Sequence, residues 1–106
     1  MTPKPDSGVP RIFRIDGRKI KSVKDFYREV GRSVNGPGGY FGQNLDALAD
    51  SLRGGFGTPE NQPYGFEWQH SDLSRRYLQD VQRGQGTFFD SVRDVFDDAG
   101  VRLNLR

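Results

Sequence analysis

Asp46 and Asp50 are the residues whose types and spacing most invite a chemical interpretation. They lie four positions apart in YFGQNLDALAD, residues 40–50, so an α-helix would place both carboxylates on one face. Paired carboxylates catalyse glycoside hydrolysis, but that chemistry needs a cleft around them. On spacing alone the pair favours an ordinary solvated helix face, where Arg53 can offset part of the repulsion.

Other catalytic and metal-binding chemistries have little support in the sequence. Cys is absent and no His or carboxylate set has the spacing of metal ligands, so we expect no metal and no other cofactor. His70 is the single His, and the neighbouring Ser71 and Ser74 are better explained as helix caps than as nucleophiles. The glycine-rich segment at 36–42 lacks the Lys-Ser/Thr pair of a phosphate-binding loop. We therefore predict no catalytic residues and no enzyme activity.

The length and composition fit one small domain. The 106 residues include 8 Phe and 4 Tyr, so large rings must supply much of the core. Residues 1–10 contain three Pro and indicate a flexible tail, which leaves 11–106 as a single domain. The N-terminus has no apolar signal segment, and no later stretch approaches a membrane span. We expect a cytoplasmic protein that does not bind membranes.

Apolar spacing and capping residues predict the element order β-α-α-β-α-α-β. Alternation of apolar and polar residues predicts strands at 11–15, 64–68 and 101–105. Helices are expected after caps at Ser22 and Thr87, over residues 44–52, and after Ser71 or Asp72. Helical material separates successive strands, so we predict an α/β fold with a small three-stranded parallel sheet and about four helices.

Tyr40 and Phe41 lie between glycines just before the helix at 44–52. Neighbouring side chains in an extended segment point in opposite directions, so one ring is expected in the core and the other at the surface. An exposed aromatic ring beside exposed carboxylates is typical of a protein interface.

The small net charge of +2 is unevenly distributed along the chain. Basic residues concentrate in the first third, whereas Asp residues gather at 46–50 and 90–98. The basic N-terminal face leaves an RNA-binding module as the alternative function, although no aromatic RNA-binding signature accompanies it.

The segment YFGQNLDALADSLRGG, residues 40–55, resembles the hallmark segment of the barstar family, the intracellular inhibitors of secreted microbial guanyl-specific ribonucleases. The matching positions are Tyr40, Phe41, Gly42, Asn44, Leu45, Asp46, Ala47, Leu48 and Asp50. The opening strand, residues 66–68, and the last helix and strand extend the resemblance over most of the chain. It implies a three-stranded parallel sheet, inhibition rather than catalysis, and a one-to-one complex between a ribonuclease and a monomeric inhibitor.

By this resemblance the helix at 44–52 and the loop before it plug the ribonuclease active site. Asp50 would stand in for an RNA phosphate, and Asp46 would pair with a basic group at the edge of that site. Tyr40 would pack on the region of the catalytic His, and Gly42 would let the backbones approach closely. The other expected contacts are Phe41, Asn44, Ala49 and Arg53, with Phe56, Asp94, Asp97 and Asp98 as further candidates.

The sequence departs from the family pattern at several of these positions. Ala49 occupies a position where the family prototype has a large aromatic residue, and Arg53 adds a positive charge near the predicted contact. The prototype is acidic overall, whereas this chain is slightly basic, so long-range steering is expected to be weaker.

Overall fold

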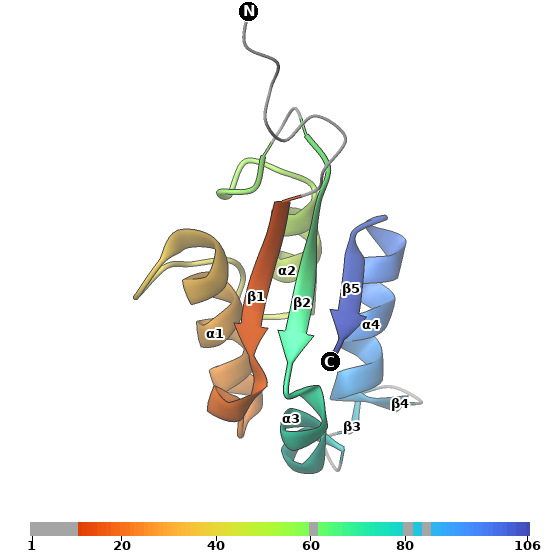
Figure 1. The fold of residues 1–106 in the computed structure, drawn as a ribbon. Helices are drawn as coiled ribbons and strands as arrows, with labels where there is room; N and C mark the ends of the chain where they lie inside the picture. Colours follow the sequence, from red (N-terminus) through yellow and green to blue (C-terminus); the bar gives the residue numbers. More distant parts are fainter. Residues whose placement is uncertain (1–10, 60–61, 80–81, 84–85) are drawn as a thin grey trace, which may run out of the picture.

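The computed structural model describes residues 11–59, 62–79, 82–83 and 86–106. The predicted tail, residues 1–10, lies outside the described residues. The elements are β1 (Arg11–Asp16), the 3-10 turn η1 (Gly17–Lys19), α1 (Val23–Asn35), α2 (Leu45–Leu52), β2 (Tyr64–Gln69), α3 (Ser71–Leu78), β3 (Gln82–Arg83), β4 (Gly86–Thr87), α4 (Phe88–Asp98) and β5 (Arg102–Leu105). Figure 1 shows their arrangement.

The main sheet has three parallel strands in the order β1-β2-β5. In register, Phe13 of β1 lies beside Phe66 of β2, which lies beside Leu103 of β5. α1 and α2 connect β1 to β2, and α3 and α4 connect β2 to β5, so both crossovers advance in the same direction across the sheet. The predicted small three-stranded parallel sheet with four helices is confirmed for the described residues.

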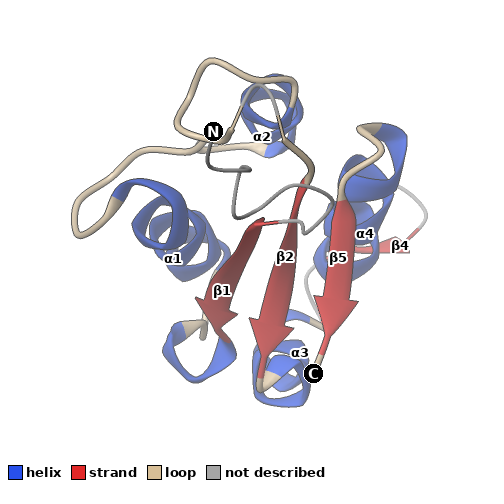
Figure 2. Ribbon diagram, turned by 45° about the horizontal axis from the view of Figure 1, so that its top comes forward, coloured by secondary structure: helices blue, strands red, loops and turns tan. Residues whose placement is uncertain are grey.

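Among the described residues, helices cover one face of this sheet (Figure 2), and the other face carries polar side chains such as Arg14 and Glu67. Phe13 and Phe66 point into the core and are 3% and 0% exposed. Arg14, the next residue of β1 after Phe13, is exposed. It forms an ion pair of 3.9 Å with Glu67 of the neighbouring strand. Parallel sheets are usually covered on both faces and carry continuous apolar runs. The alternation in these strands matches the coverage of only one face by the described residues.

Aromatic rings from the sheet, the helices and a loop form much of the core. The centroid of the Phe66 ring lies 5.1 Å from that of Phe96 in α4 and 6.0 Å from that of Phe41 in the loop before α2. Trp68, two residues further along β2, lies 5.0 Å from Phe89 by the same measure. Ring pairs at these separations stabilise a core beyond their buried area.

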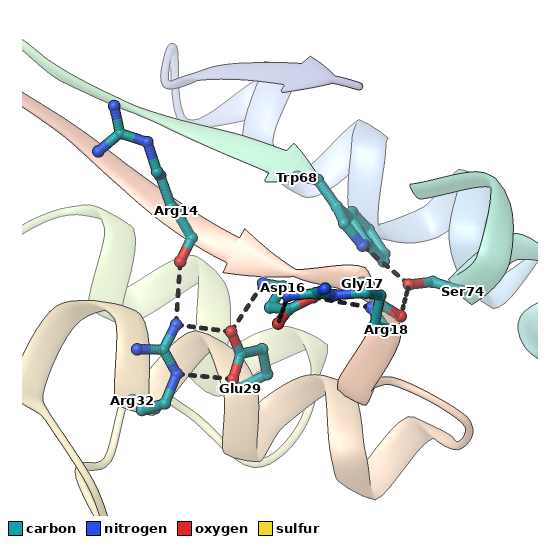
Figure 3. A network of polar contacts seen from close by, with 8 residues as sticks. All are labelled: Arg14, Asp16, Gly17, Arg18, Glu29, Arg32, Trp68 and Ser74. Carbon is teal, nitrogen blue, oxygen red and sulfur yellow. Dashed lines mark hydrogen bonds and ion pairs between the residues drawn. The ribbon is translucent and has the colours of Figure 1, made fainter. Parts of the chain in front are cut away.

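Ser74 of α3 joins β2 to the turn after β1 through its buried hydroxyl (Figure 3). The indole N–H of Trp68 donates to Ser74 Oγ at 3.0 Å, and this hydroxyl donates to the Gly17 carbonyl at 2.8 Å, 57 residues away in sequence. The interpretation of Ser74 as a helix cap is therefore wrong, because its hydroxyl satisfies two distant polar groups that would otherwise be buried without a partner.

The start of α3 also differs from the prediction of a cap at Ser71 or Asp72. His70 occupies the N-cap position with a φ of 53° and makes no side-chain capping bond. The Ser71 hydroxyl instead donates to the Arg106 carbonyl at 3.0 Å and fastens the end of the chain to α3. A tertiary contact has taken the hydroxyl that a local cap would have used.

The other two predicted caps are confirmed. Ser22 Oγ accepts from the backbone N–H of Asp25 at 3.1 Å, and Thr87 Oγ1 accepts from the backbone N–H of Asp90 at 3.2 Å. The antiparallel pair β3 and β4 directly before α4 was not predicted from the sequence pattern.

Glu29 of α1 is a buried carboxylate, 4% exposed, with three donors around it. Arg32 donates from Nε and Nη2 at 2.7 Å each, and the backbone N–H of Asp16 donates at 2.7 Å (Figure 3). The bonds to Glu29 raise the pKa of Arg32. Arg32 also donates to the carbonyl of Arg14, so this group ties α1 to the edge strand β1.

We expect Ser74→Ala to lower the free energy of unfolding by about 1–3 kcal/mol, because it leaves the Trp68 indole N–H and the Gly17 carbonyl without their shared partner. Urea denaturation would measure this loss. Ser33→Ala, which removes a hydroxyl that bonds within its own helix, is the control and is expected to cost less. Trp68→Phe in the Ser74→Ala background should cost less than it does alone, since the two residues share one bond. Identical unfolding midpoints for Ser74→Ala and the parent would contradict the role of this hydroxyl.

Candidate functional site

The short helix α2 is fastened by its apolar side and presents its carboxylates to solvent. Leu48 and Leu52 are 0% and 3% exposed, and the helix packs against α4. Asn44 is the N-cap, and its Oδ1 accepts from the backbone N–H of Ala47 at 2.8 Å. Asp46 and Asp50 are both exposed. The structure therefore agrees with the solvated face predicted from their spacing.

The two aromatic residues before α2 divide between core and surface. Phe41 is 0% exposed and packs on Phe66, whereas Tyr40 is 47% exposed. The prediction that one ring is buried and the other exposed is confirmed. Because the Phe41 ring is not available at the surface, its side chain supports the site from beneath and is not part of the exposed surface.

Gly42 brings the loop against the first turn of α2. Its φ is +100°, and a Cβ at this position would lie 2.8 Å from the backbone nitrogen of Leu48. The close approach that requires glycine is therefore made to the chain's own helix, and Gly42 is itself buried. This approach sets the position of Tyr40 relative to Asp46.

Arg53 at the end of α2 forms an ion pair with Asp50. Nη1 of Arg53 lies 3.4 Å from Oδ1 of Asp50, and the side chains are 76% and 67% exposed. An ion pair this exposed contributes about 0–1 kcal/mol. Asp46 lies in the first turn, where the helix dipole favours a negative charge. Among the described residues, neither carboxylate thus has a strong internal partner.

Phe56 extends the exposed aromatic surface from a second loop. Its side chain is 42% exposed, and its ring centroid lies 6.4 Å from that of Tyr40. The loops before and after α2 therefore meet, and the exposed rings of Tyr40 and Phe56 lie on the same side of the molecule. Ala49, the remaining predicted contact on α2, is half-buried.

Tyr40 also borders a hollow of about 760 Å³ between α1 and the loop before α2. Lys24 and Arg28 line it from α1, and Gln43 lines it from the loop. This cationic flank of the site was not predicted. The four-residue spacing of Lys24 and Arg28 was the available signal, because it places both on one side of a helix.

The hollow that acidic residues of α4 line has no lining residue from α2. Asp94 and Asp97 line a separate hollow with Arg102 of β5. Ala99, the C-cap residue directly after α4, lines a hollow with Leu52 and Arg53 at the end of α2. Asp98 is exposed. The assignment of Asp94, Asp97 and Asp98 to a partner contact remains a prediction.

No group of three or more His, Cys, Asp or Glu side chains suited to a metal ion occurs within residues 11–59, 62–79, 82–83 and 86–106. In the same part of the chain, none of the helices has the length and apolar character needed to cross a membrane.

Substitution of Gly42 tests how the site is positioned. We expect Gly42→Ala to destabilise the fold by more than Gly54→Ala, because both residues have positive φ but only Gly42 has no room for a Cβ. The positive φ costs each variant about 1–3 kcal/mol, and the clash of the Cβ with α2 is an additional cost in Gly42→Ala. Thermal or urea unfolding of the two variants compares them directly, and equal stabilities would show that the approach of the loop to α2 is not tight.

Comparison with known proteins bears on what this surface does. The family model described as Barstar (barnase inhibitor) matches residues 11–105. No curated protein matches the chain significantly. The family match runs from the first residue of β1 to the last residue of β5 and includes the whole site. This chain belongs to the barstar family.

Proposed function

We propose that this chain inhibits a secreted guanyl-specific ribonuclease and protects the cytoplasm of the cell that makes the enzyme. Family membership supports ribonuclease inhibition in general, since the family is one of barnase inhibitors rather than enzymes. We further propose a one-to-one complex with a free monomer, in which α2 and the loop before it cover the active site of the enzyme.

The observation that carries the proposal is the exposed pair Asp46 and Asp50 of α2, together with the exposed ring of Tyr40 in the loop directly before that helix. A ribonuclease active site must hold RNA phosphate with Arg, Lys and His side chains. Carboxylates accept short charge-assisted hydrogen bonds from the same donors. In the proposed complex Asp50 takes the place of a phosphate, Asp46 pairs with a cation at the rim, and Tyr40 packs against the neighbouring His.

Arg53 is compatible with this arrangement because its ion pair with Asp50 is weak and exposed. Cations in a dry interface interact with a carboxylate more strongly than Arg53 does in water. We propose that Asp50 exchanges Arg53 for the cations of the enzyme, and that the long Arg53 side chain turns to the rim of the interface.

The proposed contact surface includes the polar face of α2, with Ala49, and the exposed aromatic rings next to it. Phe41, Gly42 and Asn44 hold that surface in place without being its main contacts. A standard interface buries about 1,600 Å² in total. Asp94 and Asp97 are not required, because they line a different hollow from the one at the end of α2.

RNA binding by the basic N-terminal face is less well supported. Single strands bind stacking platforms of exposed aromatic rings, but Phe13, Phe66 and Trp68 of the sheet are buried. A gel shift of this protein with RNA, in the absence of any ribonuclease, separates the two functions. Tight binding there would favour the alternative.

Removal of the Asp50 carboxylate tests the phosphate mimicry. We expect Asp50→Ala to raise the inhibition constant for barnase by at least about 30-fold, as for an interface residue that dominates binding. Asp90→Ala, which removes an exposed carboxylate from α4, is the control and should change it less than about threefold. Equal inhibition constants for the two variants would remove Asp50 from the site. Cleavage of an RNA substrate under titration with each variant gives both values.

Ionic strength tests the charge complementarity. We expect the association rate constant with barnase to fall at least about fivefold between about 0.02 and 0.5 M NaCl, because salt screens the attraction that speeds encounter. The decrease of the association rate constant with salt should be smaller in the double variant Asp46→Ala/Asp50→Ala and unchanged in Asp90→Ala. Stopped-flow measurement of all three proteins makes the comparison, and an unchanged decrease in the double variant would place the steering charge elsewhere.

A further inference from the structure

Asn35, the last residue of α1, connects the two loops that flank α2. Its side-chain Nδ2 donates to the Tyr40 carbonyl at 2.8 Å and to the Phe56 carbonyl at 2.7 Å. These acceptors are 5 and 21 residues away in sequence. One amide group thus uses both of its donor hydrogens to hold two loops together.

Both acceptors belong to residues with exposed rings. Tyr40 and Phe56 are 47% and 42% exposed, and their centroids lie 6.4 Å apart at an interplanar angle of 50°. Large rings left in water at this separation form an apolar patch, which is typical of an interaction surface. Asn35 fixes the backbone beneath each ring, and therefore the pair.

The glycines of the loop after α2 leave room for the Asn35 amide group. Gly57 has a φ of +123°, and a Cβ there would collide with the Asn35 amide oxygen and with Val34. Gly54 and Gly55 also have positive φ, with open space around them. A loop rich in glycine loses much conformational freedom when it is ordered. Within the described part of the chain, the side-chain bond that holds the backbone at Phe56 comes from Asn35.

We propose that Asn35 is a positioning residue that preassembles Tyr40 and Phe56 as the aromatic part of the surface that binds the ribonuclease. The proposal rests on the proposed function and extends its surface to the loop that follows α2. Ordering this loop during folding removes an entropy cost that binding would otherwise carry. Asn35 itself needs no contact with the enzyme.

Two substitutions of Asn35 separate positioning from contact. Asn35→Ala removes the donors, and Asn35→Asp keeps the shape but offers carboxylate oxygens to two carbonyls. Ser33→Ala is the matched control, since it removes a bond in the last turn of the same helix, to the Val30 carbonyl, without reaching either loop. The first readout is the set of backbone ¹⁵N order parameters of the free proteins. Tyr40 and Phe56 should lose order in both Asn35 variants and keep it in Ser33→Ala, while Asp46 in α2 stays ordered in all.

The second readout is the Kd for barnase. Asn35→Ala should weaken binding about tenfold, the scale expected when two side chains and their loops must be ordered on binding. In a Tyr40→Ala/Phe56→Ala background, Asn35→Ala should have no further effect on Kd, because the rings that it positions are absent. Tyr77→Ala, which removes an exposed ring from α3, is the control for loss of an aromatic side chain.

Each other outcome overturns a distinct claim. Order parameters in Asn35→Ala equal to those of Ser33→Ala would show that Asn35 does not position the loops. Lost order with an unchanged Kd would show that the rings are not part of the binding surface. Failure of the parent protein to bind barnase would count against the proposed function itself, while the order parameters would still decide the positioning role.

Discussion

The contact of the Phe66 ring with its neighbours is the interaction on which the layout of the molecule depends. This ring lies in the middle strand and meets Phe13 of β1, Phe96 of α4 and Phe41 of the loop before α2. Every one of these rings is nearly inaccessible to water. Close packing of such rings leaves few alternative arrangements. Because Phe41 is held there, its neighbour Tyr40 must point outward, and α2 must begin where Gly42 brings the chain back.

The site depends on this packing and on a difference between buried and exposed carboxylates. In the core-facing part of α1, the carboxylate of Glu29 is fully engaged by Arg32 and by the backbone of Asp16. On α2, Asp50 has only an exposed partner in Arg53 among the described residues. Carboxylates that repel each other cost a helix about 0.2–0.5 kcal/mol per pair. The structure tolerates this small cost where the proposed partner would supply cations.

Polar side chains with long-range partners do much to define the rigid parts of the molecule. Ser74 joins α3 to β2 and η1, and Asn35 joins the loops on either side of α2. In both cases one side chain satisfies two groups from separate segments. Ser74 acts in the core, where an unsatisfied group is expensive. Asn35 acts at the surface, where its bonds keep glycine-rich loops ordered.

The sequence by itself determined the three strands of the main sheet, the four helices, the order of these elements and the exposure of the α2 carboxylates. The caps at Ser22 and Thr87 could be predicted because each depends on a bond to a residue three positions away, and the strands because alternation follows from one covered face. The family was also readable from residues 40–55, which the family match confirms.

Only the tertiary structure decided which ring of Tyr40 and Phe41 is buried, and where Ser71, Ser74 and Asn35 direct their polar atoms. It also decided that Asp94 and Asp97 face the β5 side and that Gly42 makes its close approach within the chain. Most of these outcomes depend on partners far away in sequence, such as Ser74 and Gly17, which are 57 residues apart. Local spacing contains no information about such partners, because they become neighbours only when the crossovers have packed on the sheet.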